Sequence, residues 1–111
     1  MTDREKRLAE NEAAFRDVNE SLRYVADQGT ATVQTMRLVC ECGDGECSEF
    51  IDVTSMEYEG VRAVPTHFLV RPGHVSPEIE RVVAENDRFA VVEKAPGEPA
   101  EIAKDSDPRS E

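Results

Sequence analysis

All three cysteines of this 111-residue chain lie in residues 40–47, which read Cys-Glu-Cys-Gly-Asp-Gly-Glu-Cys. Thiolates this close in sequence are typical of metal ligands or of redox partners. Structural zinc takes four nitrogen or sulfur ligands, so three cysteines leave one position that a histidine usually fills. The chain offers two histidines, His67 and His74. The segment therefore predicts a metal site formed by three cysteines and one histidine.

The spacing C-x-C-x4-C indicates how the three sulfurs could meet. Alternation along an extended chain puts Cys40 and Cys42 on the same side, with Glu41 pointing to water. Gly43 and Gly45 are expected to adopt positive φ, which would let the chain curl and bring the third cysteine to the same point.

We expect His74 to be the fourth ligand, because it follows a Pro-Gly turn at 72–73 that can direct an imidazole back across a sheet. His67 is the alternative, although its place at the start of a predicted strand is more typical of a surface or partly buried histidine. An oxygen of Asp44 or Glu46, a water molecule or no fourth ligand also remain open. The predicted metal ligands are Cys40, Cys42, Cys47 and His74.

The acidic surroundings of the cysteines favour a metal over a catalytic thiol. A nucleophilic cysteine needs a nearby base or a helix N-terminus to lower its pKa, whereas residues 38–61 include acids and neither Lys nor Arg. A divalent cation would compensate the negative charge. We therefore expect Zn2+ as cofactor and no catalytic residues. The alternatives are an iron–sulfur cluster, a switchable disulfide between Cys40 or Cys42 and Cys47, and three reduced cysteines without a role.

Composition narrows the class of partner. Lys and Arg number 13 against 24 Asp and Glu, which gives a net charge of -11. This charge repels phosphate backbones, so we expect a protein partner, to which basic charge would be complementary, and no direct nucleic-acid binding. No apolar run approaches the ~20 residues of a membrane span. A charged N-terminus and an odd number of cysteines predict a cytoplasmic protein with no membrane partner.

Residues 3–27 are predicted to form one long helix, because apolar side chains recur at steps of three, four and seven. The members of this stripe are Leu8, Phe15, Val18, Leu22 and Val25. Asn11 interrupts it where a heptad would place a hydrophobic residue. The helix either packs on its own domain or pairs in trans, as a short coiled coil or homodimer arm in which a polar residue can fix the register.

The rest of the chain predicts strands and one short helix. Residues 30–39 and 49–53 are expected to be strands that form a hairpin around the cysteines. Thr54 and Glu57 form a capping box for a helix over 55–63. Further strands are predicted at 67–71, 81–84 and 88–94.

These elements predict an α+β fold with a long N-terminal helix, a small, mostly antiparallel sheet with a metal-pinned hairpin, and a short helix. Residues 1–28 would be the N-terminal amphipathic helix, and residues 29–94 the metal-binding α+β domain. From residue 95 onward, prolines and acids leave little to pack, so residues 95–111 are predicted to form a disordered acidic tail.

Three motifs follow one another as C-x-C-G-x3-C at 40–47, Glu-Tyr-Glu at 57–59 and Pro-Gly-His at 72–74. In this order they resemble a family of small uncharacterised bacterial proteins, and residues 1–12 resemble its N-terminal helix. The resemblance spans about residues 1–94. It implies that the three motifs belong to one zinc-binding module with no established activity.

The sequence thus predicts a non-catalytic zinc-binding interaction or regulatory module, in which zinc has a structural role. Two other functions remain open. One is a thiol redox sensor that releases its metal on oxidation, and the other is a small metalloenzyme or iron–sulfur protein.

Overall fold

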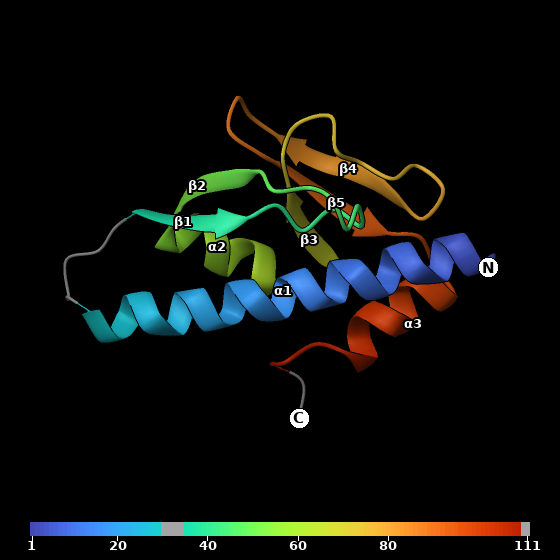
Figure 1. The fold of residues 1–111 in the computed structure, drawn as a ribbon, viewed down its shortest axis with the longest axis horizontal. Coiled ribbons are helices and arrows are strands. Elements are labelled where there is room, and N and C mark those ends of the chain that lie inside the picture. Colours follow the sequence, from blue (N-terminus) through green and yellow to red (C-terminus); the bar gives the residue numbers. More distant parts are fainter. Residues whose placement is uncertain (30–34, 110–111) are drawn as a thin grey trace.

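A computed structural model describes residues 1–29 and 35–109, apart from the side chains of 26–29. Three helices and five strands follow one another along these residues (Figure 1). Their bounds are α1 Asp3–Gly29, β1 Thr35–Val39, β2 Phe50–Thr54, α2 Ser55–Arg62, β3 His67–Val70, β4 Glu80–Glu85, β5 Ala90–Lys94 and α3 Glu98–Asp105. None of the helices in the described ranges combines the length and the hydropathy that crossing a bilayer requires.

The strands form two small antiparallel sheets. Strands β1 and β2 pair as a hairpin, and the second sheet has the order β3-β5-β4. The cysteine segment connects the two strands of the hairpin. The predicted α+β class is therefore confirmed, with the strands divided between two sheets. Residues 30–34 of the predicted first strand lie outside the described residues.

Helix α2 begins where its capping box was predicted. The Thr54 hydroxyl accepts a hydrogen bond from the Glu57 backbone N–H at 3.0 Å, and a Glu57 carboxylate oxygen accepts one from the Thr54 N–H at 2.9 Å. These two bonds satisfy N–H groups that have no partner within the helix. The helix ends at Arg62, shortly before Pro65, because a proline disfavours the helical backbone conformation in the residue that precedes it.

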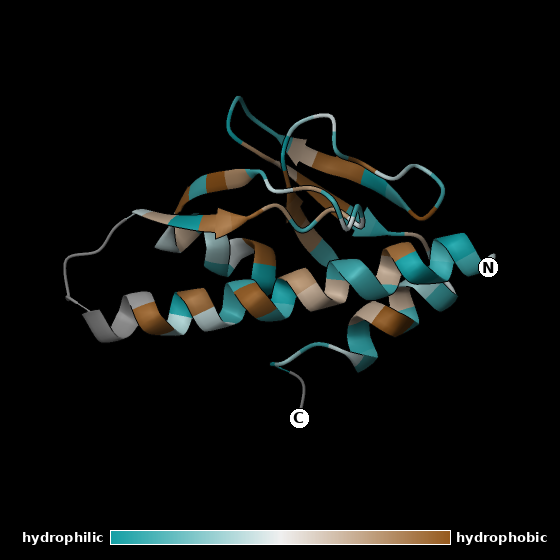
Figure 2. Ribbon diagram, in the orientation of Figure 1, coloured by the Kyte–Doolittle hydropathy of each residue, from teal (hydrophilic) through white to brown (hydrophobic). Residues whose placement is uncertain are grey.

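The core lies between the strands and the helices. Hydrophobic residues concentrate in the strands, whereas α1 alternates hydrophilic and hydrophobic residues along its length (Figure 2). Cys40 and Cys42 belong to this buried core, so the cysteine segment is part of the packed interior. Its largest fully buried apolar and aromatic members are Tyr58, Phe68, Leu38, Ile51, Leu69, Val53, Val70 and Val92.

Helix α1 buries a different face from the predicted one. Val18, Leu22 and Val25 of the apolar stripe are exposed, at 44%, 38% and 66%. The inner face instead carries the fully buried polar residues Glu12, Arg16, Asn19. Buried polar groups are tolerated where they are hydrogen-bonded or paired. Arg16 and Asn19 form hydrogen bonds to other elements, and Glu12 forms a buried ion pair with Lys94 of β5.

Arg16 shows how these partners are supplied. Its guanidinium donates to the backbone oxygens of Pro65 at 2.8 Å and Ala103 at 2.7 Å. It also lies 4.4 Å from the centroid of the Phe68 ring, a cation–π contact. One buried arginine thereby joins α1 to α3 and to the segment before β3.

The C-terminal segment also differs from the sequence expectation. Residues 98–105, predicted to be disordered, form helix α3, which contacts α1 and β5 (Figure 1). Ala103 is buried in the core, and Asp107 beyond the helix is buried as well. The composition suggested disorder because the segment has few apolar residues, but a buried ion pair and helix contacts hold it in place.

Candidate metal centre

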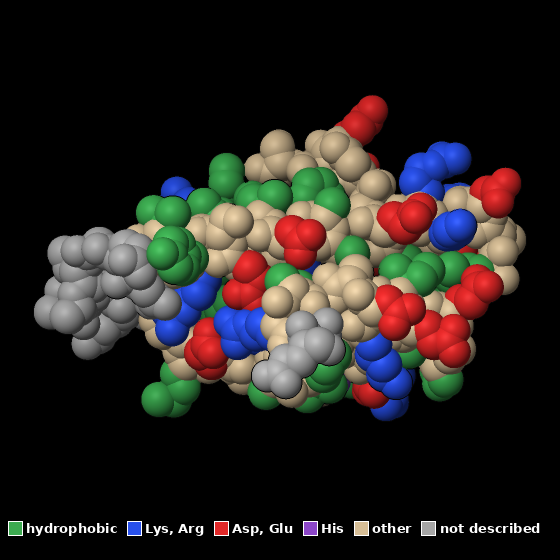
Figure 3. All heavy atoms as spheres, turned by 90° about the horizontal axis from the view of Figure 1, so that it is seen from below, with side chains coloured by type: hydrophobic (Ala, Val, Ile, Leu, Met, Phe, Trp, Pro, Cys, Tyr) green, Lys and Arg blue, Asp and Glu red, His purple; other side chains and the backbone are tan. Residues whose placement is uncertain are grey.

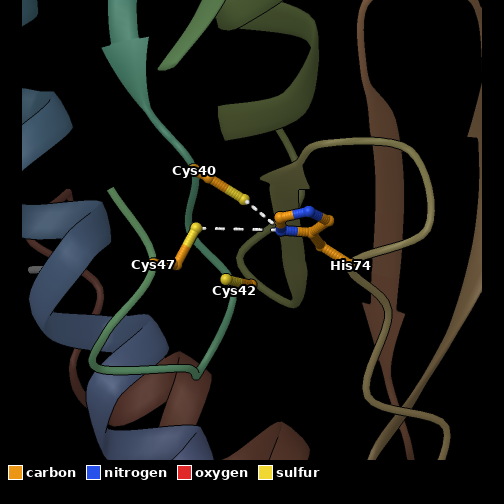
Figure 4. Close-up of side chains that lie close together, drawn as sticks. All are labelled: Cys40, Cys42, Cys47 and His74. Atoms are coloured by element: carbon orange, nitrogen blue, oxygen red, sulfur yellow. Dashed lines mark hydrogen bonds between the residues drawn. The ribbon is translucent and has the colours of Figure 1, made fainter. Parts of the chain in front are cut away.

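The β1–β2 hairpin and the turn after β3 bring the predicted ligands together. Cys40 and Cys42 follow β1 directly, and Cys47 lies on the return to β2. The Cys40 N–H donates to the Glu49 carbonyl at 3.1 Å, which extends the hairpin pairing past the ends of its strands. His74 lies in the turn after β3, and its ring points toward the sulfurs (Figure 4).

The four side chains are close enough to share one ion. Their ligand atoms all lie within 4.8 Å of one another. His74 Nδ1 is 3.6 Å from Cys40 Sγ and 3.7 Å from Cys47 Sγ. Tetrahedral zinc, with bonds of about 2.3 Å to sulfur and 2.0–2.1 Å to nitrogen, would place such atoms about 3.6 Å apart. The donor set and these spacings fit a tetrahedral metal ion.

The second histidine lies elsewhere. His67 begins β3 and is the register partner of Glu93 in β5. Its Nε2 atom is 4.0 Å from a carboxylate oxygen of that residue. Of the two candidate histidines, the structure thus brings His74 to the cysteines and leaves His67 on the three-stranded sheet.

The glycines do not act as predicted. Neither Gly43 nor Gly45 has a positive φ, which among the described residues occurs at Gly73, with φ 86°, and Gly97, with φ 96°. Gly73 thus shapes the turn that delivers His74, whose N–H donates to the Arg71 carbonyl at 3.0 Å. The cysteine segment curls through a turn in which the Cys47 N–H donates to the Asp44 carbonyl at 3.1 Å.

Gly43 is needed for close packing instead. A Cβ atom at this position would lie 2.7 Å from the carbonyl oxygen and 2.9 Å from the Cα atom of Leu8 in α1. The Asn11 side-chain amide also donates to the Gly43 carbonyl at 2.9 Å. The cysteine segment and α1 therefore touch backbone to backbone, which only a residue without a side chain permits.

Glu41 was expected to face water, but it is fully buried. One carboxylate oxygen accepts a hydrogen bond from the Asn19 amide at 2.7 Å, and the other accepts one from the Leu69 N–H at 2.9 Å. Burial raises the pKa of Glu41 to about 7, although these hydrogen bonds act in the opposite direction. Glu41, between the first two cysteines, therefore joins the cysteine segment to α1 and β3 by buried hydrogen bonds.

The sulfurs have unequal surroundings. A hydrogen bond from the Cys42 thiol lowers the pKa of Cys40 and raises that of Cys42. The Arg71 backbone N–H donates to Cys40 Sγ at 3.2 Å and acts in the same direction on Cys40. Burial raises the pKa of Cys47. Cys40 is thus the thiol that this environment most favours as a thiolate, the form that binds metals.

A cavity of about 530 Å³ opens beside the cluster. Cys42 and His74 form part of its wall, and Arg4, Arg7 and Asn11 of α1 form another part. The Arg4 guanidinium also forms an ion pair with Glu78. The cavity gives solvent a route to one side of a cluster whose first two cysteines are otherwise buried.

Sequence reasoning missed the support that surrounds the cluster. Asn19 and Asn11 stand 20 or more residues before the loop they contact, and nothing in the local pattern marks them as its partners. The one available signal is the polar residue Asn11 within the apolar stripe, to which the alternative of pairing in trans assigns a role in fixing the register. Its amide in fact donates a hydrogen bond to the Gly43 carbonyl in the cysteine segment.

Comparisons of the chain with protein-family models, with curated proteins and with solved structures found no match.

Proposed function

We propose that this protein is a non-catalytic zinc-binding interaction or regulatory module, in which Cys40, Cys42, Cys47 and His74 hold a structural Zn2+ ion. The observation that carries the proposal is the convergence of four ligand atoms within 4.8 Å. The 3.6 and 3.7 Å separations between the imidazole nitrogen and two sulfurs support it further.

The spacing of the ligands favours a single ion over a cluster. An iron–sulfur cluster places several iron and sulfide atoms between its ligands, which spreads the ligands farther apart than one ion does. Three sulfurs and one nitrogen in tetrahedral arrangement are typical of zinc. We therefore propose zinc as the resident metal.

A structural role is supported by the number of ligands and by their burial. Catalytic zinc sites generally have three protein ligands and leave a fourth position for water, whereas four protein ligands close the coordination shell. Cys40 and Cys42 are only 2% and 3% exposed. A metal here would join the β1–β2 hairpin to the turn after β3, and such a cross-link stabilises the folded chain.

The interaction part of the proposal is supported by α1. Its exposed residues Val18, Leu22 and Val25 form an apolar row at helical spacing. The face in Figure 3 intersperses acidic and basic side chains with hydrophobic ones. We propose a protein partner in the cytoplasm, with a homodimer through α1 as the alternative. The net charge of -11 favours basic proteins over nucleic acid.

The test is metal content by elemental analysis of the untagged protein, followed by exchange of the metal for Co2+. Tetrahedral Co2+ bound to thiolates gives a characteristic visible spectrum and a sulfur-to-metal charge-transfer band. The chain should bind one ion, and Cys42→Ser and His74→Asn should weaken binding strongly. His67→Asn is the matched control, because it removes the other histidine and should leave binding unchanged.

Two results would overturn the proposal. One is a wild-type chain without bound metal after purification in the absence of chelators, which also takes up no Co2+. The other is an equal loss of metal from His67→Asn and His74→Asn, which would contradict the assignment of His74 as the ligand.

A thiol redox sensor is the second candidate, and the partial exposure of Cys47 favours it. One equivalent of peroxide, with two protons from solvent, would oxidise two metal-bound thiolates to a disulfide and be reduced to two water molecules. Loss of two thiolates would release the metal. Stoichiometric metal release with peroxide, accompanied by a disulfide that includes Cys47 in peptide mapping and reversed by a dithiol reductant, would support this role. Retention of the metal under mild oxidation would exclude it.

A further inference from the structure

We propose that Asn19 of α1 is a positioning residue for the metal centre, and that docking of α1 and binding of the metal are coupled through Asn19, Glu41 and Gly43. This inference rests on the proposed function, since it concerns how the same four ligands are held. It adds a role for α1, which contributes no ligand.

Asn19 contacts the ligand-bearing segment directly. Its side-chain amide donates to the Val39 carbonyl at 2.8 Å, and its side-chain oxygen accepts from the Val39 N–H at 2.8 Å. The side chain thus pairs with the backbone of β1 as a neighbouring strand would, and fixes the residue immediately before Cys40. The same amide donates to Glu41 at 2.7 Å.

Glu41 carries this contact to the other side of the metal centre. Its carboxylate accepts from the Leu69 N–H at 2.9 Å, and its own N–H donates to the Leu69 carbonyl at 2.9 Å. Two residues later in the chain, the Arg71 N–H donates to Cys40 Sγ. The turn that carries His74 follows directly. One buried network therefore spans α1, the cysteine segment and the strand that leads to the histidine.

A second contact lies eight residues, about two turns, toward the N-terminus of α1. Asn11 donates to the Gly43 carbonyl, and the Gly43 Cα approaches the Leu8 backbone too closely for a Cβ atom to fit. Gly43 follows Cys42 in the chain. Helix α1 consequently touches the backbone on both sides of the first two ligands, at Val39 and at Gly43.

The chemistry of the α1 interface makes docking sensitive to the loop. Its fully buried side chains are polar, and the buried apolar ones are the small Ala9 and Ala13. Apolar contacts tolerate small displacements, whereas hydrogen bonds weaken steeply when their geometry is lost. A loop that loses its metal and relaxes would break the bonds to Asn19 and Asn11 and leave Glu41 unpaired in the interior, which is unfavourable.

Linkage makes the effect reciprocal. If the metal stabilises docked α1, then docked α1 raises metal affinity by the same factor. Residues that support metal ligands typically change affinity by about 10- to 100-fold when mutated. Loss of the Asn19 contacts should therefore weaken zinc binding by about tenfold or more, although Asn19 is not a ligand.

The experiment compares two variants with matched controls in the full chain. Asn19→Ala removes the contact to Val39 and Glu41, and Asp17→Asn alters an exposed side chain of the same helix. Gly43→Ala forces the loop away from Leu8, whereas a Cβ at Gly45 meets no atom closer than 3.8 Å. Zinc affinity is measured by competition with a chromophoric chelator. Amide hydrogen exchange of α1 is measured with and without zinc.

Coupling predicts that Asn19→Ala and Gly43→Ala bind zinc about tenfold more weakly or worse, while Asp17→Asn and Gly45→Ala stay within about twofold. It also predicts that zinc slows exchange along wild-type α1, and slows it less in the two variants. If Asn19 had only a structural role, Asn19→Ala would lower the free energy of unfolding by the same amount with and without zinc. Coupling requires that Asn19→Ala lower it more in the presence of zinc than in its absence.

Equal zinc affinity in all five proteins, or exchange of α1 that zinc does not change, overturns the coupling and leaves the metal site intact. A wild-type chain that binds no zinc overturns the proposed function and the coupling together. If Asn19→Ala fails to fold even with zinc, Gly43→Ala decides the question by the same criteria, because its substitution creates no buried unpaired polar group.

Discussion

Arg62 at the end of α2 and Asp107 beyond α3 form a buried ion pair between residues 45 positions apart in the chain. The Arg62 side chain is fully buried and that of Asp107 is 4% exposed. Arg62 also donates to Glu20 of α1 at 2.8 Å. The pair therefore ties the C-terminal segment to two other helices, and accounts for the order of a segment whose composition predicts disorder.

Asp107→Asn should destabilise the protein by about 2 kcal/mol, because it removes one of the two carboxylates that compensate the buried Arg62 charge and leaves Glu20 as the other. Urea denaturation monitored by circular dichroism measures this loss. Asp105→Asn is the matched control, since Asp105 is an exposed acid two residues earlier, at the end of α3, and should change the free energy of unfolding by less than about 0.5 kcal/mol. Similar stabilities for the two variants would show that the ion pair does not hold the segment.

Glu57 should make stability depend on pH in the acidic range. Hydrogen bonds from Arg88 and from the Thr54 backbone lower the pKa of Glu57 from 4.5 to about 2. A lowered folded-state pKa stabilises the folded chain above the unfolded value, and this contribution is lost as pH falls through the folded value. The free energy of unfolding should therefore decrease between pH 4.5 and pH 2.

Glu57→Gln isolates this contribution, because glutamine retains the capping hydrogen bond without the charge. The variant should lose less stability than the wild type between pH 4.5 and pH 2. Glu85→Gln, at an exposed position of β4, should follow the wild-type curve. Parallel curves for the wild type and Glu57→Gln in urea titrations would contradict the assignment.

The Tyr58 hydroxyl should be a source of instability. The residue is fully buried, burial raises its pKa, and its oxygen has no hydrogen-bond partner among the described residues. Tyr58→Phe removes an unsatisfied polar group and should raise the free energy of unfolding by about 1 kcal/mol. Tyr24→Phe, at a 66% exposed position, should have no measurable effect. A loss of stability in Tyr58→Phe would mean that the hydroxyl has a partner in solution.

Removal of the metal should destabilise the fold. A ligand that binds only the folded state, present at 100 times its dissociation constant, contributes about 2.7 kcal/mol. For a chain of this size, its removal should lower Tm by more than about 10 °C. Differential scanning calorimetry before and after addition of a chelator measures the shift, and re-addition of zinc should reverse it. Cys42→Ser should show no such response.

Much of the local structure could be predicted from the sequence. The capping box of Thr54 and Glu57 needs only residues three positions apart, so its hydrogen bonds are fixed by local geometry. The hairpin around the cysteines follows from two alternating strands and a glycine-containing turn. The four candidate ligands could be named because metal chemistry restricts which side chains qualify, and the structure brings those four close enough together to hold an ion.

Which side chains α1 buries depends on contacts with residues distant in the sequence. A polar residue in a helical pattern is normally expected to face water, because burial of a polar group is unfavourable unless it is bonded. Whether Asn19 can be buried depends on Val39 and Glu41, which lie 20 or more residues away. The order of the C-terminal segment depends in the same way on Arg62. Metal chemistry limits the candidate ligands to a few side chains that can be named from their type and spacing, whereas the environment of those side chains depends on contacts that exist only once the chain has folded.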